Sequence, residues 1–200
     1  MSDIEIKRGL KDVYFATSEA SFIDGNIGKL LYRGYNIDDM ARYSTFEETV
    51  YLLLYGKLPT AKELSDFDAQ LRANRTLPRE VLQVIEIVKA SHPMDVLRTA
   101  TSALAAFDPE TADNSKEATL RKGIRLTAQA PTIVAAHDRI RQGKAAVEPN
   151  PRLGHASNFL YMLFDKEPDP EEAKLIDLDF VTVQLAQKNL VLLLLQLKIA

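Results

Sequence analysis

The sequence of 200 residues has the length of one domain, or of one domain and part of another. Hydrophobic residues make up 46% of it and charged residues 26%, values typical of a globular rather than a disordered chain. The net charge of -3 leaves no basic excess, which excludes a protein that binds nucleic acid by electrostatic attraction. The absence of cysteine excludes disulfides, thiolate catalysis and most structural zinc sites.

The chain shows no signal for export or for insertion into a membrane. Its first ten residues, MSDIEIKRGL, lack the apolar core of a signal peptide. No stretch approaches the ~20 uninterrupted apolar residues that a membrane span needs. We therefore expect a cytoplasmic protein without a membrane partner.

The first 36 residues carry short segments of β-type sequence. These segments are Asp12–Phe15, Ser21–Ile23 and Lys29–Tyr32. Asp24 and Gly25 supply a tight turn between the last two, because both residue types are favoured in turns. The pattern predicts a small antiparallel β-ribbon, which is too small to be stable alone.

The next strong signal is a helix that starts at Thr45. Glu48 follows three residues later, which is the spacing of a capping box. Apolar residues then form a broad face along the helix, which ends at Gly56. Pro59 prevents the helix from restarting. A helix this apolar needs neighbours on several sides, so we predict that it lies near the centre of the domain.

Every later periodic segment is helical. Capping residues or prolines mark the helix starts, and apolar residues recur at spacings of three and four. The expected helices begin near Thr60, Pro78, Pro93, Glu117, His155 and Asp169. Pro131 should kink the long helix from Glu117 to Arg141, because proline removes a backbone donor there. Asp108–Lys116 is polar and rich in turn formers, and we interpret it as a linker.

Three histidines are candidates for catalysis, but each also has a structural explanation. His92 precedes a proline and fits a helix start that bonds the backbone, and His137 fits a satisfied or solvated position on a long helix. His155 follows Gly154 and precedes small residues, so it is the most interesting, although a helix N-terminal turn is the favoured explanation. No histidine pair has metal-ligand spacing, so we expect no metal site.

Other charged residues also have both a functional and a structural explanation. The acids at Glu47 and Glu48 fit the capping and dipole requirements of a helix N-terminus. Arg33 lies between aromatic residues and could stack on their rings, hold a carboxylate or serve the structure alone. The structural reading is favoured at each of these positions.

The motifs resemble one known family. Ile23–Ile37 reads IDGNIGKLLYRGYNI, and Ser44–Thr60 reads STFEETVYLLLYGKLPT. Both are similar to the N-terminal region of bacterial and archaeal citrate synthases and 2-methylcitrate synthases. Four shorter matches follow the same family order, namely GLKDVY from Gly9, HPMDVLRT from His92, PTIVAAHDRI from Pro131 and HASNFLYML from His155.

The resemblance implies a mainly α fold, namely a multi-helical fragment of the citrate synthase large domain with a small N-terminal β-ribbon. We expect three parts: residues 1–36 with the ribbon, residues 37–177 as the partial helical domain, and residues 178–200 as a divergent leucine-rich helix. The resemblance also implies a homodimer.

Citrate synthases are acyltransferases of the tricarboxylic acid cycle that condense acetyl-CoA with oxaloacetate, giving citrate and CoA. The resemblance therefore implies these two substrates and no separate cofactor. In the family, the catalytic aspartate and histidine come from later segments, as do the substrate-binding arginines. A segment of the type His-Ala-Asp-His-x-x-Asn-Ala-Ser supplies a histidine that binds oxaloacetate.

The match ends where that segment should begin, after Asp177. Laid without gaps, the chain has Ala186 in place of the oxaloacetate-binding histidine, and Asn189 is the sole letter of the motif that survives. We therefore assign no catalytic and no substrate-binding residue, with Asn189 and His155 as weak candidates only. The abrupt change indicates a truncated or frameshifted reading frame, an artificial variant or a diverged binding protein.

Two functions are consistent with a chain whose match to the family ends after Asp177. The first is an incomplete citrate synthase that is inactive alone. The alternative is a non-catalytic helical scaffold or dimerisation protein.

Overall fold

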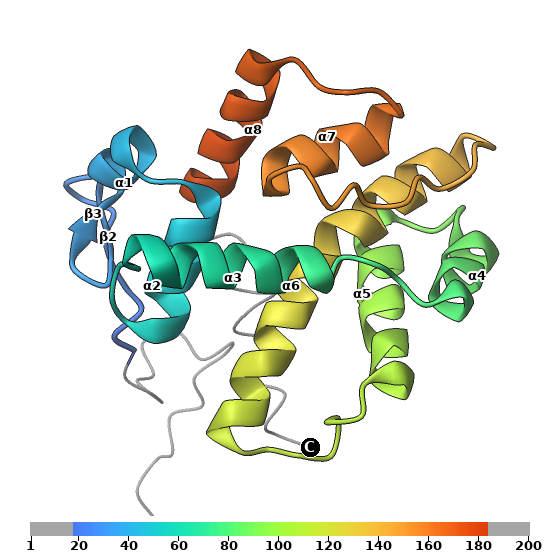
Figure 1. The fold of residues 1–200 in the computed structure, drawn as a ribbon, viewed down its shortest axis with the longest axis horizontal. Helices are drawn as coiled ribbons and strands as arrows, with labels where there is room; N and C mark the ends of the chain where they lie inside the picture. Colours follow the sequence, from blue (N-terminus) through green and yellow to red (C-terminus); the bar gives the residue numbers. More distant parts are fainter. Residues whose placement is uncertain (1–17, 184–200) are drawn as a thin grey trace, which may run out of the picture.

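A computed structural model describes residues 18–183 of the protein. Within that range the protein contains eight α-helices, one 3-10 helix and a three-stranded sheet, which confirms the expected mainly α fold (Figure 1). The helices are α1 (Ile37–Tyr43), α2 (Phe46–Tyr55), α3 (Ala61–Ala73), α4 (Arg79–Val88), α5 (Pro93–Leu104), η2 (Ala105–Phe107), α6 (Lys116–Arg141), α7 (His155–Phe164) and α8 (Pro170–Val183).

The sheet is antiparallel and lies beside α1 (Figure 1). Strand β1 (Ser21–Asp24) pairs with β2 (Lys29–Tyr32), in a register that sets Asp24 opposite Lys29. Gly28 closes the turn between them with a φ of 64°, a conformation that glycine adopts without strain. Strand β3 (Tyr35–Asn36) extends the expected ribbon. The expected strand at 12–15 lies outside the described residues.

Helix α2 begins with the predicted capping box. The Thr45 side chain accepts from the backbone N–H of Glu48, and the Glu48 side chain accepts from the backbone N–H of Thr45. Gly56 ends the helix with a φ of 80°. Phe46, Val50 and Tyr51 are buried against α3 and α6, as the prediction of a central helix requires.

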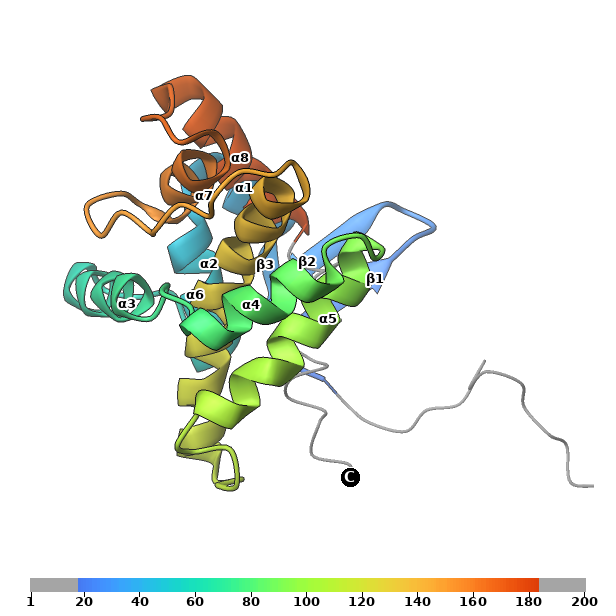
Figure 2. The same ribbon diagram turned by 90° about the vertical axis from the view of Figure 1, so that its right-hand side faces the viewer.

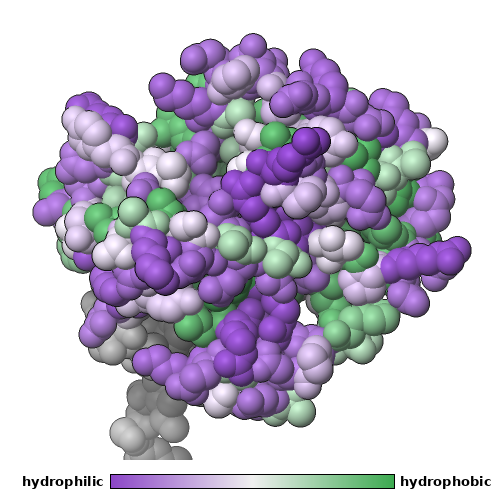
Figure 3. All heavy atoms as spheres, viewed as in Figure 1, coloured by the Kyte–Doolittle hydropathy of each residue, from purple (hydrophilic) through white to green (hydrophobic). Residues whose placement is uncertain are grey.

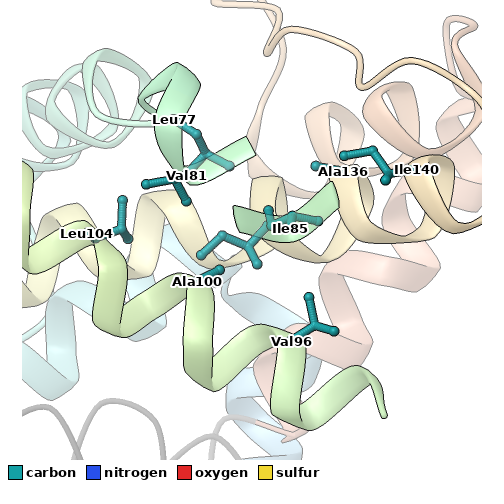
Figure 4. Packing of buried hydrophobic residues seen from close by; sticks show 9 residues of the cluster. Leu77, Val81, Ile85, Val96, Ala100, Leu104, Ala136 and Ile140 are labelled. Atoms are coloured by element: carbon teal, nitrogen blue, oxygen red, sulfur yellow. The ribbon is translucent and has the colours of Figure 1, made fainter. Parts of the chain in front are cut away.

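A second core lies between α4, α5 and α6. Figure 4 shows its side chains gathered between these helices. Val81 and Ile85 on α4, with Val96 and Ala100 on α5, are completely buried. Figure 2 shows α4 and α5 side by side, and both pack against α6. Pro131 lies within α6, and the helix changes direction near its middle (Figure 1), as the loss of one backbone donor favours.

The polar segment 108–116 links two helices of the same core. It joins α5 to α6, which pack directly against each other. Arg125 on α6 donates to both carboxylate oxygens of Asp108 at 2.8 Å and to Glu110 at 2.8 Å. These charge-assisted bonds hold the segment on the helix that follows it.

Helix α8 runs without a break from Pro170 to Val183. It therefore crosses the expected boundary between residues 177 and 178, and residues 184–200 of the expected C-terminal helix lie outside the described range.

The face shown in Figure 3 is covered mainly by hydrophilic side chains, with hydrophobic residues in separate small patches. Among the described helices, none is long and apolar enough to cross a bilayer.

Candidate functional site

The candidate site lies where α8 meets the N-terminal ends of α2 and α7. We call this contact the α8 seam, and define it by Glu47, His155, Asp177 and Phe180. A cavity of about 450 Å³ opens beside it and is lined by Glu47, His155 and Asp177, among others. Figure 1 shows α7 and α8 as neighbours at one side of the molecule.

Glu47 caps a helix other than its own. Its Oε1 atom accepts a hydrogen bond from the backbone N–H of His155 at 3.0 Å, although the two residues lie 108 positions apart. The N-cap residue of α7 is Gly154, which makes no side-chain capping bond. The Glu47 carboxylate therefore satisfies one free N–H of α7 and lies at the positive end of its dipole.

Asp177 does the same for α2. Its Oδ1 atom accepts from the backbone N–H of Phe46 at 3.2 Å, across 131 positions. The pKa of Asp177 is raised from 3.8 to about 6, mainly by burial and to a smaller extent by the charges of Glu47 and Glu48, against the lowering effect of the Phe46 N–H. The carboxyl is therefore partly protonated in mildly acidic solution.

His155 is buried, with 3% of its surface exposed. Its ring stacks on Phe46 at a centroid distance of 4.4 Å and meets the edge of Phe180 at 6.0 Å. Among the described residues neither ring nitrogen has a hydrogen-bond partner. Burial, with a smaller contribution from the charge of Arg75, lowers the pKa of His155 to about 3. The imidazole is therefore a neutral packing group, poorly matched to proton transfer near neutral pH.

Two arginines hold the loop that leads into α7. Arg75 is almost completely buried and donates to the carbonyl of Leu153 at 2.7 Å. Arg72 donates to the carbonyl of Pro151 at 3.1 Å and pairs with Asp68. Together they fix the chain just before the N-terminus of α7.

The far end of α7 is held by a third arginine. Arg139 on α6 donates to the carbonyl of Leu163 at 3.4 Å and pairs with Asp165 at 3.1 Å. Asp165 ends α7 in the left-handed conformation, with a φ of 56°. Both ends of α7 are thus attached to distant parts of the chain.

The other predicted candidates have structural roles. His92 is the N-cap of α5, and its Nδ1 accepts from the backbone N–H of Met94 at 3.2 Å. His137 is buried, and its Nε2 lies 3.1 Å from the carbonyl oxygen of Lys89. Arg33 donates to the carbonyl of Leu53 at 3.3 Å and to a carboxylate of the same chain, so all three residues make contacts of the kind that the structural interpretation predicts.

Only one of the two weak site candidates lies within the described residues. His155 lies in the α8 seam, whereas Asn189 and the substituted position Ala186 lie outside the described residues. In residues 18–183, no group of three or more His, Asp or Glu residues is arranged to hold a metal ion.

Sequence reasoning missed the roles of Glu47, Asp177 and Arg75. Glu47 was explained by its own helix, and Asp177 was used only to mark the end of a match. No local pattern identifies them, because their partners are 78 to 131 positions away. The one available signal was Gly154, a helix N-cap that needs a capping group from elsewhere.

Comparison with known proteins decides the family. The family described as "Citrate synthase, C-terminal domain" matches residues 9–184. The chain belongs to the citrate synthase family. The citrate synthase of Deinococcus radiodurans is 45% identical over 177 residues, which cover 88% of this chain and 47% of that protein. The chain thus spans about half the length of the curated relatives that it matches.

Solved structures of citrate synthases share the fold. The enzyme of Pyrobaculum aerophilum superposes with a TM-score of 0.84 at 41% identity, over 88% of this chain and 46% of that one. The enzyme of the archaeon Thermoplasma acidophilum, solved with carboxymethyl coenzyme A and oxaloacetate, superposes with a TM-score of 0.83 at 27% identity, over 88% and 47%. The predicted family resemblance is confirmed.

Proposed function

We propose that this chain supplies the helical frame of a citrate synthase-type acyltransferase, and that the 200 residues alone do not catalyse condensation. The observation that carries the proposal is the state of His155 in a chain of this family. It is the histidine of the α8 seam, yet it is buried, its ring contacts those of Phe46 and Phe180, and burial lowers its pKa to about 3. It is therefore not free to exchange a proton with a substrate.

The chemistry of the reaction supports the same proposal. Condensation of acetyl-CoA with oxaloacetate needs a base for the acetyl methyl group and a donor for the enolate. It also needs cations that hold two carboxylates. In the α8 seam, Asp177 and Glu47 are each bonded to a helix N-terminus, and Arg75 is bonded to a backbone carbonyl. These groups stabilise the fold, so the reacting groups must come from other segments.

The substrates and partners are proposed from the relatives. We propose acetyl-CoA and oxaloacetate, because the Thermoplasma acidophilum enzyme was solved with a CoA derivative and oxaloacetate. We further propose a cytoplasmic homodimer of the tricarboxylic acid cycle that needs no separate cofactor. The relatives favour this function over a dedicated scaffold, because the proteins of Deinococcus radiodurans, Pyrobaculum aerophilum and Thermoplasma acidophilum are citrate synthases.

The test is the release of free CoA thiol from acetyl-CoA and oxaloacetate by the purified 200-residue chain. We expect no release above that of a boiled sample, while the Deinococcus radiodurans enzyme in the same buffer is active. Release that is linear in protein and follows the chain through a second purification would contradict the proposed inactivity.

A further inference from the structure

Arg75 is the most deeply buried of the described arginines and lysines, with 1% of its surface exposed. It lies in the loop after α3, where the Thr132 side chain of α6 donates to its backbone carbonyl at 2.9 Å. Its own Nη1 atom donates at 2.7 Å to the carbonyl of Leu153, just before α7. The residue is therefore held by contacts with α6 and with the start of α7, away from bulk water.

The guanidinium group of Arg75 has donors that these contacts leave unused. Its Nε and Nη2 atoms are inaccessible to solvent, and neither has a hydrogen-bond partner among residues 18–183. The two carboxylates whose charges act on it are bonded elsewhere. Asp68 pairs with Arg72 at 2.7 Å, and Glu47 accepts from the N–H of His155 at 3.0 Å. Buried charged donors without an acceptor are costly, so Arg75 needs a further partner.

His155 supplies a second set of buried polar atoms beside Arg75. Only 3% of the residue is exposed, and in the part of the chain that the structure describes neither ring nitrogen has a partner. The residue lies two positions after Leu153, whose carbonyl holds Arg75. The charge of Arg75 also contributes to the lowered pKa of His155, so the two side chains lie within electrostatic reach of each other. A neutral imidazole still carries one N–H donor.

We propose that Arg75 and His155 together bind a small monovalent anion of the size of chloride. The sign of the ligand follows from the donors, because an anion only accepts hydrogen bonds, whereas a guanidinium only donates them. Such charge-assisted bonds are about twice as strong as neutral ones. The size follows from the burial of both side chains, which leaves no path for a larger organic anion. This inference concerns stability and is independent of the catalytic proposal.

The anion joins two distant parts of the chain. Arg75 follows α3, whereas His155 is the first residue of α7. The unfolded chain does not hold these residues together, so it does not form the site. An anion that binds the folded state alone stabilises that state in proportion to the occupancy of the site. The attachment of α7 therefore depends on the anion concentration.

The experiment compares urea unfolding of the full 200-residue chain in sodium chloride and in sodium gluconate. Equal ionic strength keeps the screening of surface charges the same, and gluconate is too large for an enclosed site. We expect chloride to lower the unfolding equilibrium constant, by about tenfold when its concentration is about ten times the dissociation constant. Gluconate should have no such effect, and equal stability in the two salts would overturn the proposal.

Three variants locate the effect. Arg75→Met removes the charge and keeps a long apolar side chain, so chloride should no longer stabilise the protein. Arg98→Met is the matched control and should keep the full chloride effect, because Arg98 is exposed and pairs with Asp95 on the surface. His155→Phe removes the ring N–H and should raise the dissociation constant for chloride by about tenfold or more. A chloride effect of the same size in Arg75→Met and in the unchanged chain would contradict the assignment.

Crystals of the unchanged chain grown in sodium bromide give a measurement that needs no variant to fold. Bromide takes the place of chloride and is identified by its anomalous scattering. We expect a bromide peak within hydrogen-bond distance of Nε and Nη2 of Arg75. Water at that position, or bromide on the surface alone, would overturn the proposal, because the buried donors would then be satisfied without an anion.

Discussion

The α4–α5–α6 core and the α8 seam are stabilised in different ways. The core is built from aliphatic side chains on neighbouring segments, with Val81, Ile85 and Val96 completely buried. The seam joins α2, α7 and α8 through carboxylates that bond to helix N-termini more than 100 positions away. The first contact depends on apolar area and is insensitive to pH, whereas the second depends on where protons reside.

The comparison shows why one region is easy to recognise from sequence and the other is not. Burial of aliphatic residues leaves a periodic pattern along each helix. A carboxylate that caps a distant helix looks the same in sequence as one that caps its own. The following variants test this contrast, starting with the largest expected effect.

Replacement of Ile85 by Ala should be the most damaging change. This side chain is completely buried in the core, so its removal should cost about 2–5 kcal/mol in the free energy of unfolding, measured with urea. Ile87→Ala is the matched control on the same helix, because Ile87 is 81% exposed. Equal losses for both variants would show that α4 is not packed as described.

Replacement of Glu47 by Ala should cost about 1 kcal/mol, the typical value for a lost N-cap, because the N–H of His155 loses its acceptor. Glu47→Gln keeps an oxygen acceptor and should lose less. Amide exchange at the start of α7 locates the effect. A loss confined to α2 would indicate that Glu47 caps only its own helix.

Replacement of Asp177 by Asn should stabilise the protein at pH 7.5. Because the folded pKa of about 6 lies above the ordinary value, the ionised carboxyl costs stability once the pH exceeds about 6. After allowance for solvent screening, the gain should be about 1 kcal/mol in urea unfolding. The gain should disappear near pH 4, and a gain of the same size there would exclude a titration effect.

Replacement of His155 by Phe should have the smallest effect at pH 7.5, within about 1 kcal/mol. The change removes two ring nitrogens that have no partner among the described residues and keeps an aromatic ring against Phe46. It should also reduce the loss of stability below pH 6.5, because the unfolded chain no longer gains a proton at this position. A loss above about 2 kcal/mol at pH 7.5 would indicate a required hydrogen bond.

Much of the local structure could be predicted because its causes are local. The capping boxes at Thr45 and Thr60 each join residues three positions apart, and both are present. The ribbon turn and the left-handed Gly56 follow from residue types at single positions. The family could be predicted for the same reason, because its motifs are continuous segments.

The segment 108–116 shows where such reasoning stops. Its composition predicts a linker, but it does not predict that Arg125 binds Asp108 from 17 positions away. The arginine lies on a helix whose own pattern explains it as a surface residue, so nothing in the sequence joins the two.

The sequence by itself therefore determined the helices, their ends, the ribbon and the family, since these depend on neighbours in the chain. Only the tertiary structure decided that Glu47 caps α7, that Asp177 caps α2 and that His155 is buried without a charge. The physical reason is that pKa values and trans-capping bonds depend on which distant groups exclude water from a side chain, and no local pattern records this.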